Sequence, residues 1–289
     1  MIQLAVVSGK GGTGKTVLTA SLATLLPGQK VSIDADVDAA NLSLLLTPKD
    51  TSVQEFRGMD GAFIDKDLCI GCGLCSEACY FDAIRSDGYL YEVAPYRCEG
   101  CGTCTLVCSE DAVSMKPRVT GMIHYAKSRA GPLLYGSLTP GSGNSGLLVH
   151  RLRQEAGMRY PDIPFVLIDG PPGIGCPLIS TITGIQVAIL VTEPSRSAQS
   201  DLMRLIKLCR SFHVKMFLVI NRYDIGSEIT EEIVRMAGQE NIGLLGCIPY
   251  DPTVIDATRK GIPVVGEHGP ASEAIHQIAQ NIVGELSIV

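Results

Sequence analysis

A glycine-rich run near the N-terminus constrains the fold of this chain more than any other feature of the sequence. It extends from Ser8 to Thr16 and contains the pattern Gly-x4-Gly-Lys-Thr. The apolar residues 2–7 precede it, and an apolar, helix-like stretch follows to about residue 26. A strand, a glycine-rich loop and a helix in this order form a phosphate-binding loop (P-loop). We therefore expect a nucleotide site at the start of an α/β fold.

The chemistry of this loop predicts what its residues do. Glycines allow backbone N–H groups to point at phosphate oxygens, the Lys15 ammonium neutralises the β- and γ-phosphates, and the Thr16 hydroxyl ligates Mg²⁺. The predicted nucleotide-binding residues of the run are Gly9, Lys10, Gly11, Gly12, Thr13, Gly14, Lys15, Thr16 and Val17.

Apolar strand-like runs alternate with helix-like segments through most of the chain. After the first unit, strands are expected at residues 31–34, 165–169, 186–192, 215–220 and 242–248. Helices are expected near residues 198–210, 229–238 and 272–286. Strands that are apolar throughout and separated by helices predict an α/β fold, with a mostly parallel sheet and helices on both faces. Residues 131–146, rich in glycine, serine and proline, are expected to form a hairpin or a loop.

The middle of the chain holds a duplicated cysteine pattern. Each copy reads Cys-x2-Cys-x2-Cys-x3-Cys, and the copies lie 29 residues apart. Eight of the eleven cysteines belong to it: Cys69, Cys72, Cys75, Cys79, Cys98, Cys101, Cys104 and Cys108. The strand–helix alternation stops before this segment and resumes after it. We therefore predict that residues 1–59 and 117–289 form the nucleotide-binding domain, and that residues 60–116 form a small inserted α+β domain.

The cysteine spacing predicts two [4Fe–4S] clusters. In two-cluster proteins with this spacing, the first three cysteines of one run bind one cluster and the fourth binds the other. We assign one cluster to Cys69, Cys72, Cys75 and Cys108, and the second to Cys98, Cys101, Cys104 and Cys79. The alternative is two zinc sites, but these usually pair two close ligands with two distant ones. The segment resembles bacterial two-cluster ferredoxins, except that Tyr80 and Ser109 stand where those runs continue with proline.

The negative charge of the chain is concentrated in the predicted insert. The formal net charge is −6, and residues 60–118 contain ten acidic and five basic side chains. An acidic insert predicts a redox protein or apo-metalloprotein partner with a basic patch, and it favours neither nucleic acid nor an anionic membrane as a partner. The apolar positions Ile275, Ile278, Ile282 and Leu286 are expected to pack on the sheet, since no lysine or arginine follows Lys260. No signal peptide or membrane span is recognised, so we expect a cytoplasmic protein.

An additional lysine in the P-loop indicates a family. The sequence Lys10-Gly-Gly-Thr-Gly-Lys-Thr16 resembles the deviant Walker motif of the MinD, ParA, Mrp and nitrogenase iron protein superfamily of ATPases. The resemblance implies an ATP-dependent homodimer in which Lys10 reaches the nucleotide of the partner subunit. It also implies catalytic roles for Lys10, Lys15 and Asp36.

Further motifs of this superfamily occur in order along the chain. Residues 33–41 resemble switch I, where Asp36 would orient the attacking water, with Asp34 and Asp38 as alternatives. Residues 168–173 resemble Walker B and switch II, with Asp169 near Mg²⁺ and Gly173 sensing the γ-phosphate. Asn221 and Pro249 would lie near the adenine base. The resemblance implies ATP, although the run Asn-Arg-Tyr-Asp at residues 221–224 is also similar to the GTPase motif Asn-Lys-x-Asp.

Three cysteines lie outside the repeat. Cys209 and Cys247 are expected to be packed in the core, since free cysteines are commonly buried. Cys176 follows Asp169 by seven residues, the offset at which the nitrogenase iron protein carries a cluster cysteine. Packing is the preferred interpretation of Cys176, and a role as a transient ligand is the alternative.

These features lead to one preferred function and two alternatives. The preferred function is an ATPase that delivers electrons during the assembly or activation of another metalloprotein. The first alternative is an iron–sulfur or metallocluster carrier related to Mrp. The second, more remote, is a spatial organiser similar to MinD or ParA, which the acidic charge and the absence of lysine and arginine after Lys260 disfavour.

Overall fold

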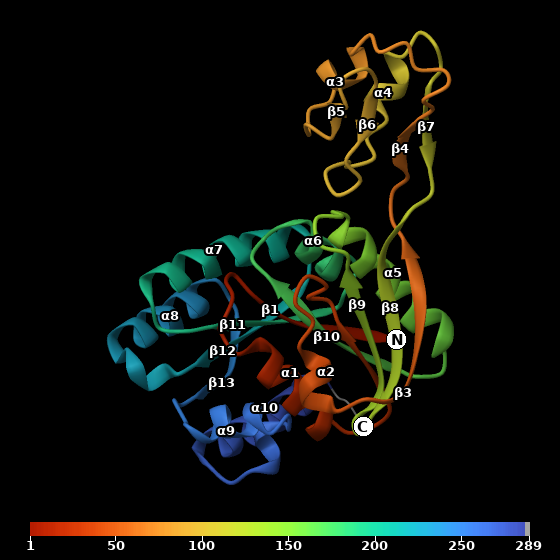
Figure 1. The fold of residues 1–289 in the computed structure, drawn as a ribbon. Coiled ribbons are helices and arrows are strands. Elements are labelled where there is room, and N and C mark those ends of the chain that lie inside the picture. The colour runs from red at the N-terminus through yellow and green to blue at the C-terminus, as the bar shows by residue number, and fades with distance from the viewer. Residues whose placement is uncertain (287–289) are drawn as a thin grey trace.

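The structure is a computed structural model that describes residues 1–286. A nine-stranded sheet crosses the molecule in the order β13-β12-β11-β1-β10-β2-β9-β8-β3 (Figure 1). Its strands are β1 (Ile2–Ser8), β2 (Lys30–Asp34), β3 (Lys49–Arg57), β8 (Val119–Ser128), β9 (Gly131–Leu138), β10 (Phe165–Pro172), β11 (Val187–Thr192), β12 (Lys215–Asn221) and β13 (Gly243–Ile248). All neighbouring strands from β13 to β9 are parallel, whereas β8 pairs antiparallel with both β9 and β3. The predicted α/β fold with a mostly parallel sheet is confirmed.

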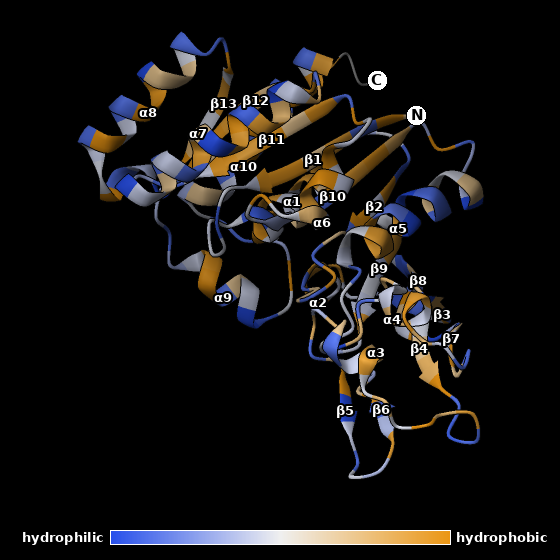
Figure 2. Ribbon diagram, turned by 90° about the horizontal axis from the view of Figure 1, so that it is seen from above, coloured by the Kyte–Doolittle hydropathy of each residue, from blue (hydrophilic) through white to orange (hydrophobic). Residues whose placement is uncertain are grey.

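Helices cover both faces of the sheet. One face packs against α5 (Ser145–Arg159), α6 (Cys176–Ile182), α7 (Arg196–Ser211) and α8 (Ser227–Gln239). The other face packs against α1 (Lys15–Leu25), α2 (Leu42–Leu46), α9 (Thr253–Arg259) and α10 (Pro270–Leu286). The central strands are hydrophobic along their length, while α7 and α8 carry hydrophilic residues on their outer sides (Figure 2). Two 3-10 helices, Tyr223–Ile225 and Val264–Gly266, complete the elements that surround the main sheet.

One edge of the sheet was not predicted from the sequence. The strands β3 and β8 were not predicted, and residues 131–138, expected as part of a hairpin or loop, form β9 inside the main sheet. Two glycines and a proline in β9 conceal its strand character, yet Leu133 and Leu134 are fully buried. Gly136 is required in this strand because a Cβ there would lie 2.8 Å from the Leu148 side chain of α5. The expectation holds in part: β9 is the second strand of an antiparallel hairpin with β8, and residues 139–144 form a loop.

Residues 60–116 leave the sheet between β3 and β8 and form a small unit of their own (Figure 1). An antiparallel ribbon of β4 (Gly61–Ile64) and β7 (Val113–Lys116) connects this unit, called the insert below, to the main sheet. The insert also contains the hairpin β5 (Ile84–Ser86) and β6 (Tyr91–Val93) and the one-turn helices α3 (Leu74–Glu77) and α4 (Thr103–Leu106). Ile64, Ile84 and Val113 pack with Cys75 and Cys104 in its own small core. No helix among residues 1–286 has the length and apolar character needed to cross a membrane.

Candidate functional site

The glycine-rich loop joins β1 to α1 at the carboxyl edge of the parallel strands. It ends at Gly14, whose φ of 91° is in the left-handed region. A Cβ at Gly14 would lie 2.4 Å from Nδ2 of Asn221, and this same amide donates a 2.9 Å hydrogen bond to the Thr13 carbonyl. Among the described residues, the buried Thr13 hydroxyl has no hydrogen-bond partner. The loop is thus held by Asn221 in a shape that only glycine permits at position 14.

Lys15 and Asp169 lie together beneath the loop. Burial lowers the pKa of the Lys15 ammonium, and the nearby carboxylates of Asp169 and Asp36 oppose this shift. Asp169 lies in β10, where it accepts a 2.8 Å hydrogen bond from the Thr19 hydroxyl. Burial raises the pKa of Asp169 to about 6, although hydrogen bonds from Thr16 and Thr19 lower it. A buried carboxylate beside a threonine hydroxyl is a donor set that suits Mg²⁺. The geometry therefore fits the metal ligands predicted from the sequence, Thr16 and Asp169.

The raised pKa of Asp169 predicts a gain in stability when its charge is removed. A carboxyl whose pKa is raised in the folded state destabilises that state progressively as pH rises from the unfolded value of about 4 to about 6. We expect Asp169→Asn, which retains an acceptor for Thr19, to raise the free energy of unfolding of the nucleotide-free protein by about 1–3 kcal/mol at pH 7.5. Urea unfolding at pH 7.5 and pH 5 measures this, and the gain should shrink at pH 5. Equal stability of variant and parent at pH 7.5 would contradict a raised pKa of Asp169 in the folded state.

The three aspartates of the predicted switch I have different environments. Asp34 is fully buried and accepts hydrogen bonds from the backbone N–H groups of Asp36 (3.1 Å) and Leu42 (2.8 Å), so its carboxylate shapes the loop. Asp38 is exposed. Asp36 is half-buried, and burial raises its pKa while the neighbouring Lys15 opposes the shift. Of the three, Asp36 is the carboxylate best placed beside Lys15 to act on a water at the phosphates.

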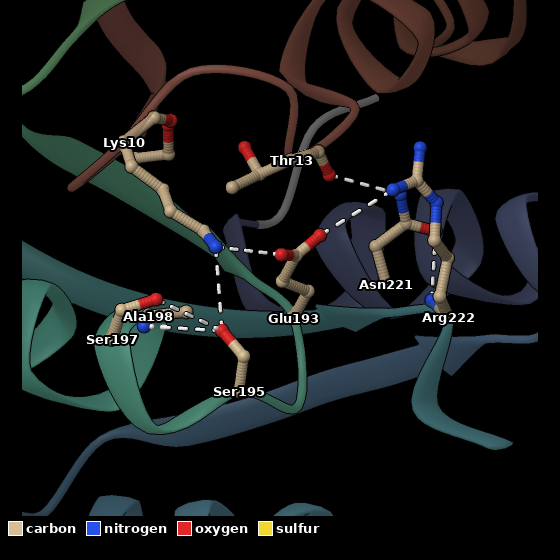
Figure 3. A network of polar contacts seen from close by, with 9 residues as sticks. Lys10, Thr13, Glu193, Ser195, Ser197, Ala198, Asn221 and Arg222 are labelled. Carbon is tan, nitrogen blue, oxygen red and sulfur yellow. Dashed lines mark hydrogen bonds and ion pairs between the residues drawn. The ribbon is translucent and has the colours of Figure 1, made fainter. Parts of the chain in front are cut away.

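Lys10 is held within its own chain in this structure. Its ammonium forms an ion pair with Glu193 (2.7 Å) and donates a hydrogen bond to the Ser195 hydroxyl (3.3 Å), as Figure 3 shows. The other oxygen of Glu193 pairs with Arg222 at 3.4 Å. Glu193 and Ser195 follow the end of β11, and neither was predicted as a site residue. An acidic residue directly after a buried strand of a parallel sheet is the signal that could have identified Glu193.

A cavity beside the P-loop has the position expected for the base. Its lining includes Asn221 and Pro249, the two residues predicted to lie near the base, and Val17 of the predicted P-loop run. Arg222 and Tyr250 line it as well. The Asp224 carboxylate accepts a 2.8 Å hydrogen bond from the backbone N–H of Tyr250 and so joins the two loops that form the cavity. A flat apolar base with polar edges fits such a lining.

The eight cysteines of the insert line two separate cavities. Cys69, Cys72, Cys75 and Cys108 line the first, called cavity 1 below. Cys79, Cys98, Cys101 and Cys104 line the second, called cavity 2. Each set therefore contains three cysteines of one run and the fourth of the other run. The same two groups were assigned to the two clusters from the sequence.

The donor geometry of these cavities suits a group larger than one ion. Among residues 1–286, no three His, Cys, Asp or Glu side chains converge on the position of a single metal ion. Four thiols around a common space are the ligands that a four-iron cubane requires, whereas zinc needs four ligands at about 2.3 Å from one centre. The backbone N–H groups of Ala83 and Ala62 point at the sulfurs of Cys79 (3.3 Å) and Cys98 (3.5 Å), which are contacts typical of cluster thiolates.

Arg118 fixes the segment around Cys98 to the base of the insert. Its guanidinium donates hydrogen bonds to the carbonyl oxygens of Met59 (3.2 Å), Pro95 (2.6 Å) and Cys98. Glu99, the next residue, places its carboxylate against Gly143 in the loop that leads into α5. A Cβ added at Gly143 would lie only 2.6 Å from this carboxylate. The sequence offered no signal for this junction, since its partners are far apart in the chain.

The remaining three cysteines differ in exposure. Cys209 is fully buried in the core, and burial raises its pKa to about 12, while Cys247 is partly buried against the same core. Cys176 is exposed at the first residue of α6, so the preferred interpretation of Cys176 as a packed side chain is wrong. It begins a helix shortly after residues 168–173, which resemble switch II.

Comparisons with known proteins place this geometry in a family. The model of the CobQ/CobB/MinD/ParA nucleotide binding domain family matches residues 4–264. The chain belongs to this family and is a P-loop ATPase. An uncharacterised protein of Methanocaldococcus jannaschii is 34% identical, over 98% of this chain and 96% of that protein.

Two further similarities bear on the fold and the function. A protein of Pyrococcus horikoshii called iron-sulfur cluster carrier protein is 26% identical, over 98% of this chain and 86% of that protein. The structure of the septum site-determining protein MinD with Mg-ADP, from the same species, superimposes with a TM-score of 0.60 at 20% identity and covers 99% of this chain and 98% of that chain. The latter similarity supports the fold alone.

Proposed function

We propose that this ATPase uses its nucleotide cycle to hand over an iron–sulfur cluster during the assembly of another metalloprotein. The observation that carries the proposal is the pair of four-cysteine cavities in the insert of a P-loop ATPase. The similarity to iron-sulfur cluster carrier proteins over nearly the whole chain supports cluster transfer over electron delivery. Residues 60–116 are the proposed iron–sulfur domain, and residues 1–59 and 117–289 the proposed ATPase domain.

The residues of the nucleotide site define how ATP would act. Lys15 holds the β- and γ-phosphates, Thr16 and Asp169 hold Mg²⁺, and Asp36 orients the attacking water. The γ-phosphate would order the switch loops that carry Asp36 and Gly173, and hydrolysis would release them. Two chains would close face to face around ATP, so that Lys10 leaves Glu193 and reaches the partner subunit's nucleotide.

Electron delivery remains a second candidate because each cavity already provides four thiols. A complete ligand set suits a resident cluster, which supplies one-electron chemistry when bound. An anaerobic EPR redox titration, with and without Mg²⁺ and a non-hydrolysable ATP analogue, separates the two candidates. For a carrier we expect two cluster signals whose potentials do not change with nucleotide. A shift of about 59 mV, a tenfold effect for one electron, would favour gated electron delivery, and the absence of cluster signals would overturn both.

Lys10→Ala tests the proposed dimer. We expect the variant to bind ATP with an affinity close to that of the parent, but to lose at least about 100-fold in hydrolysis rate, because a charge acting on the transition state is removed. Steady-state phosphate release and equilibrium binding of a fluorescent ATP analogue measure the two effects. Glu193→Gln is the matched control, since it breaks the ion pair while retaining Lys10 and should keep hydrolysis. Hydrolysis within twofold of the parent in Lys10→Ala would exclude the role in the partner's site.

A further inference from the structure

The two cysteine cavities of the insert differ in what surrounds them. Cavity 2 lies near the base of the β4–β7 ribbon, where the insert joins the main sheet. Arg118 donates hydrogen bonds to the carbonyl oxygens of Pro95 and Cys98 there. Gly100, which lines cavity 2, lies against Asp60, since an added Cβ would be 2.4 Å from the Asp60 carbonyl oxygen. Cavity 1 lies farther along the β4–β7 ribbon. Its lining includes Ile64 and Val113, the last pair of that ribbon, whereas Ala62, nearer the base, lines cavity 2.

The mouth of cavity 1 carries an exposed apolar surface. Leu68, Ile70 and Leu74 are 52%, 66% and 45% exposed, and we call these three residues the collar. Ile70 and Leu74 line cavity 1 together with the exposed Cys72, and Leu68 precedes Cys69 in the chain. Large apolar side chains that gather in the open around a ligand cavity are typical of a binding surface.

Acidic residues accompany the collar. Asp67 adjoins Leu68, Glu77 stands one turn beyond Leu74 on α3, and Glu110 lines cavity 1. All three are exposed, and within residues 1–286 none of them forms an ion pair. The nearby Lys66 is already paired with Asp87 at 3.1 Å. The apolar collar is thus accompanied by carboxylates whose charges are not paired with basic side chains.

We propose that the collar is the surface on which the acceptor protein docks, and that cavity 1, not cavity 2, is the exit of the insert. The acceptor's matching face is apolar at its centre and lined by lysine and arginine at its edge. Charge complementarity guides the encounter, and the apolar contact holds the complex long enough for transfer. The inference rests on the proposed iron–sulfur function, and it assigns the contact with the acceptor to cavity 1 alone.

A c-type cytochrome with a lysine-ringed haem edge is a probe of this chemistry. The protein is reduced with dithionite, freed of the excess anaerobically and mixed with the cytochrome, so that one reduced cluster is oxidised as one ferric haem is reduced. Stopped-flow absorbance measures the second-order rate constant. We expect Ile70→Ser with Leu74→Ser to lower this constant about tenfold. The matched control is Tyr80→Ser with Leu106→Ser, two side chains of the insert that are 89% and 86% exposed and line neither cavity. The control should match the parent.

Further readouts separate the possible failures. Iron content and EPR spectra are measured for both double variants, and each rate constant is expressed per reduced cluster, so that a remaining difference in rate reports docking. Asp67→Asn with Glu110→Gln should weaken the dependence of the rate on salt concentration. Equal rates in the collar variant and the control would overturn the docking surface and leave the iron–sulfur function standing. A parent protein that binds no iron would overturn both.

Discussion

Lys15→Ala is expected to lower ATP hydrolysis by about 10³-fold or more while the iron content of the protein stays at the parent level. Lys15 is the first residue of α1. In the proposed function its ammonium neutralises phosphate charge, and removing such a group from a buried site removes stabilisation that develops in the transition state. The cysteine cavities lie in an insert with its own small core, joined to the sheet by one ribbon. Their ligands therefore do not depend on the occupancy of the P-loop.

Lys30→Ala is the matched control for this experiment. Lys30 is also buried, burial likewise lowers its pKa, and it lies at the start of β2, away from the nucleotide loop. Its loss should affect stability and leave hydrolysis per folded molecule unchanged. Phosphate release and iron analysis on the same preparations give both quantities. Loss of iron in Lys15→Ala would contradict the independence of the two parts.

Cys108→Ser is expected to remove about half of the bound iron. Cys108 lines cavity 1, whose other three cysteines come from the first run, so the cluster there loses one of its four thiolates. A serine hydroxyl is a harder, weaker ligand for an iron–sulfur cluster than a thiolate. Iron and acid-labile sulfide per chain measure the loss, and EPR of the reduced protein should retain the signal of the cluster in cavity 2.

Cys176→Ser provides the control for Cys108→Ser. Cys176 is an exposed cysteine at the start of α6, outside the insert, and it lines neither cysteine cavity. Its substitution should leave iron content and transfer unchanged. A drop in iron on losing Cys176 would revive its role as a ligand, and full iron retention in Cys108→Ser would contradict the crossed assignment of the fourth cysteines.

The sequence predicted the parts of this protein whose signals are local. The P-loop pattern lies within nine residues, and the repeated cysteine spacing led to the same two groups that the cavities bring together. The order of apolar strands identified the parallel part of the sheet. Each of these signals depends on a fixed spacing along the chain.

The features that the sequence did not predict depend on contacts between distant segments. The ion pair of Lys10 with Glu193 joins residues 183 positions apart, and Arg118 bonds to carbonyl groups of three separate residues. The roles of Asp34, Asp36 and Asp38 could not be separated from the sequence, because what distinguishes Asp34 is its burial and the hydrogen bond it accepts from the N–H of Leu42. Strand β9 was missed because burial against β2 and β8, not its composition, makes it a strand.

The most direct test of the account measures cluster transfer. The protein, loaded anaerobically with ⁵⁵Fe-labelled clusters, is mixed with the apo form of a [4Fe–4S] enzyme and a chelator that captures released iron. Recovery of the acceptor's activity and label is followed with MgATP, with a non-hydrolysable analogue and without nucleotide, for the parent and for Lys15→Ala. The account predicts that MgATP speeds transfer in the parent at least tenfold and has no effect on the loaded variant. Equal transfer with and without MgATP in both proteins would contradict it.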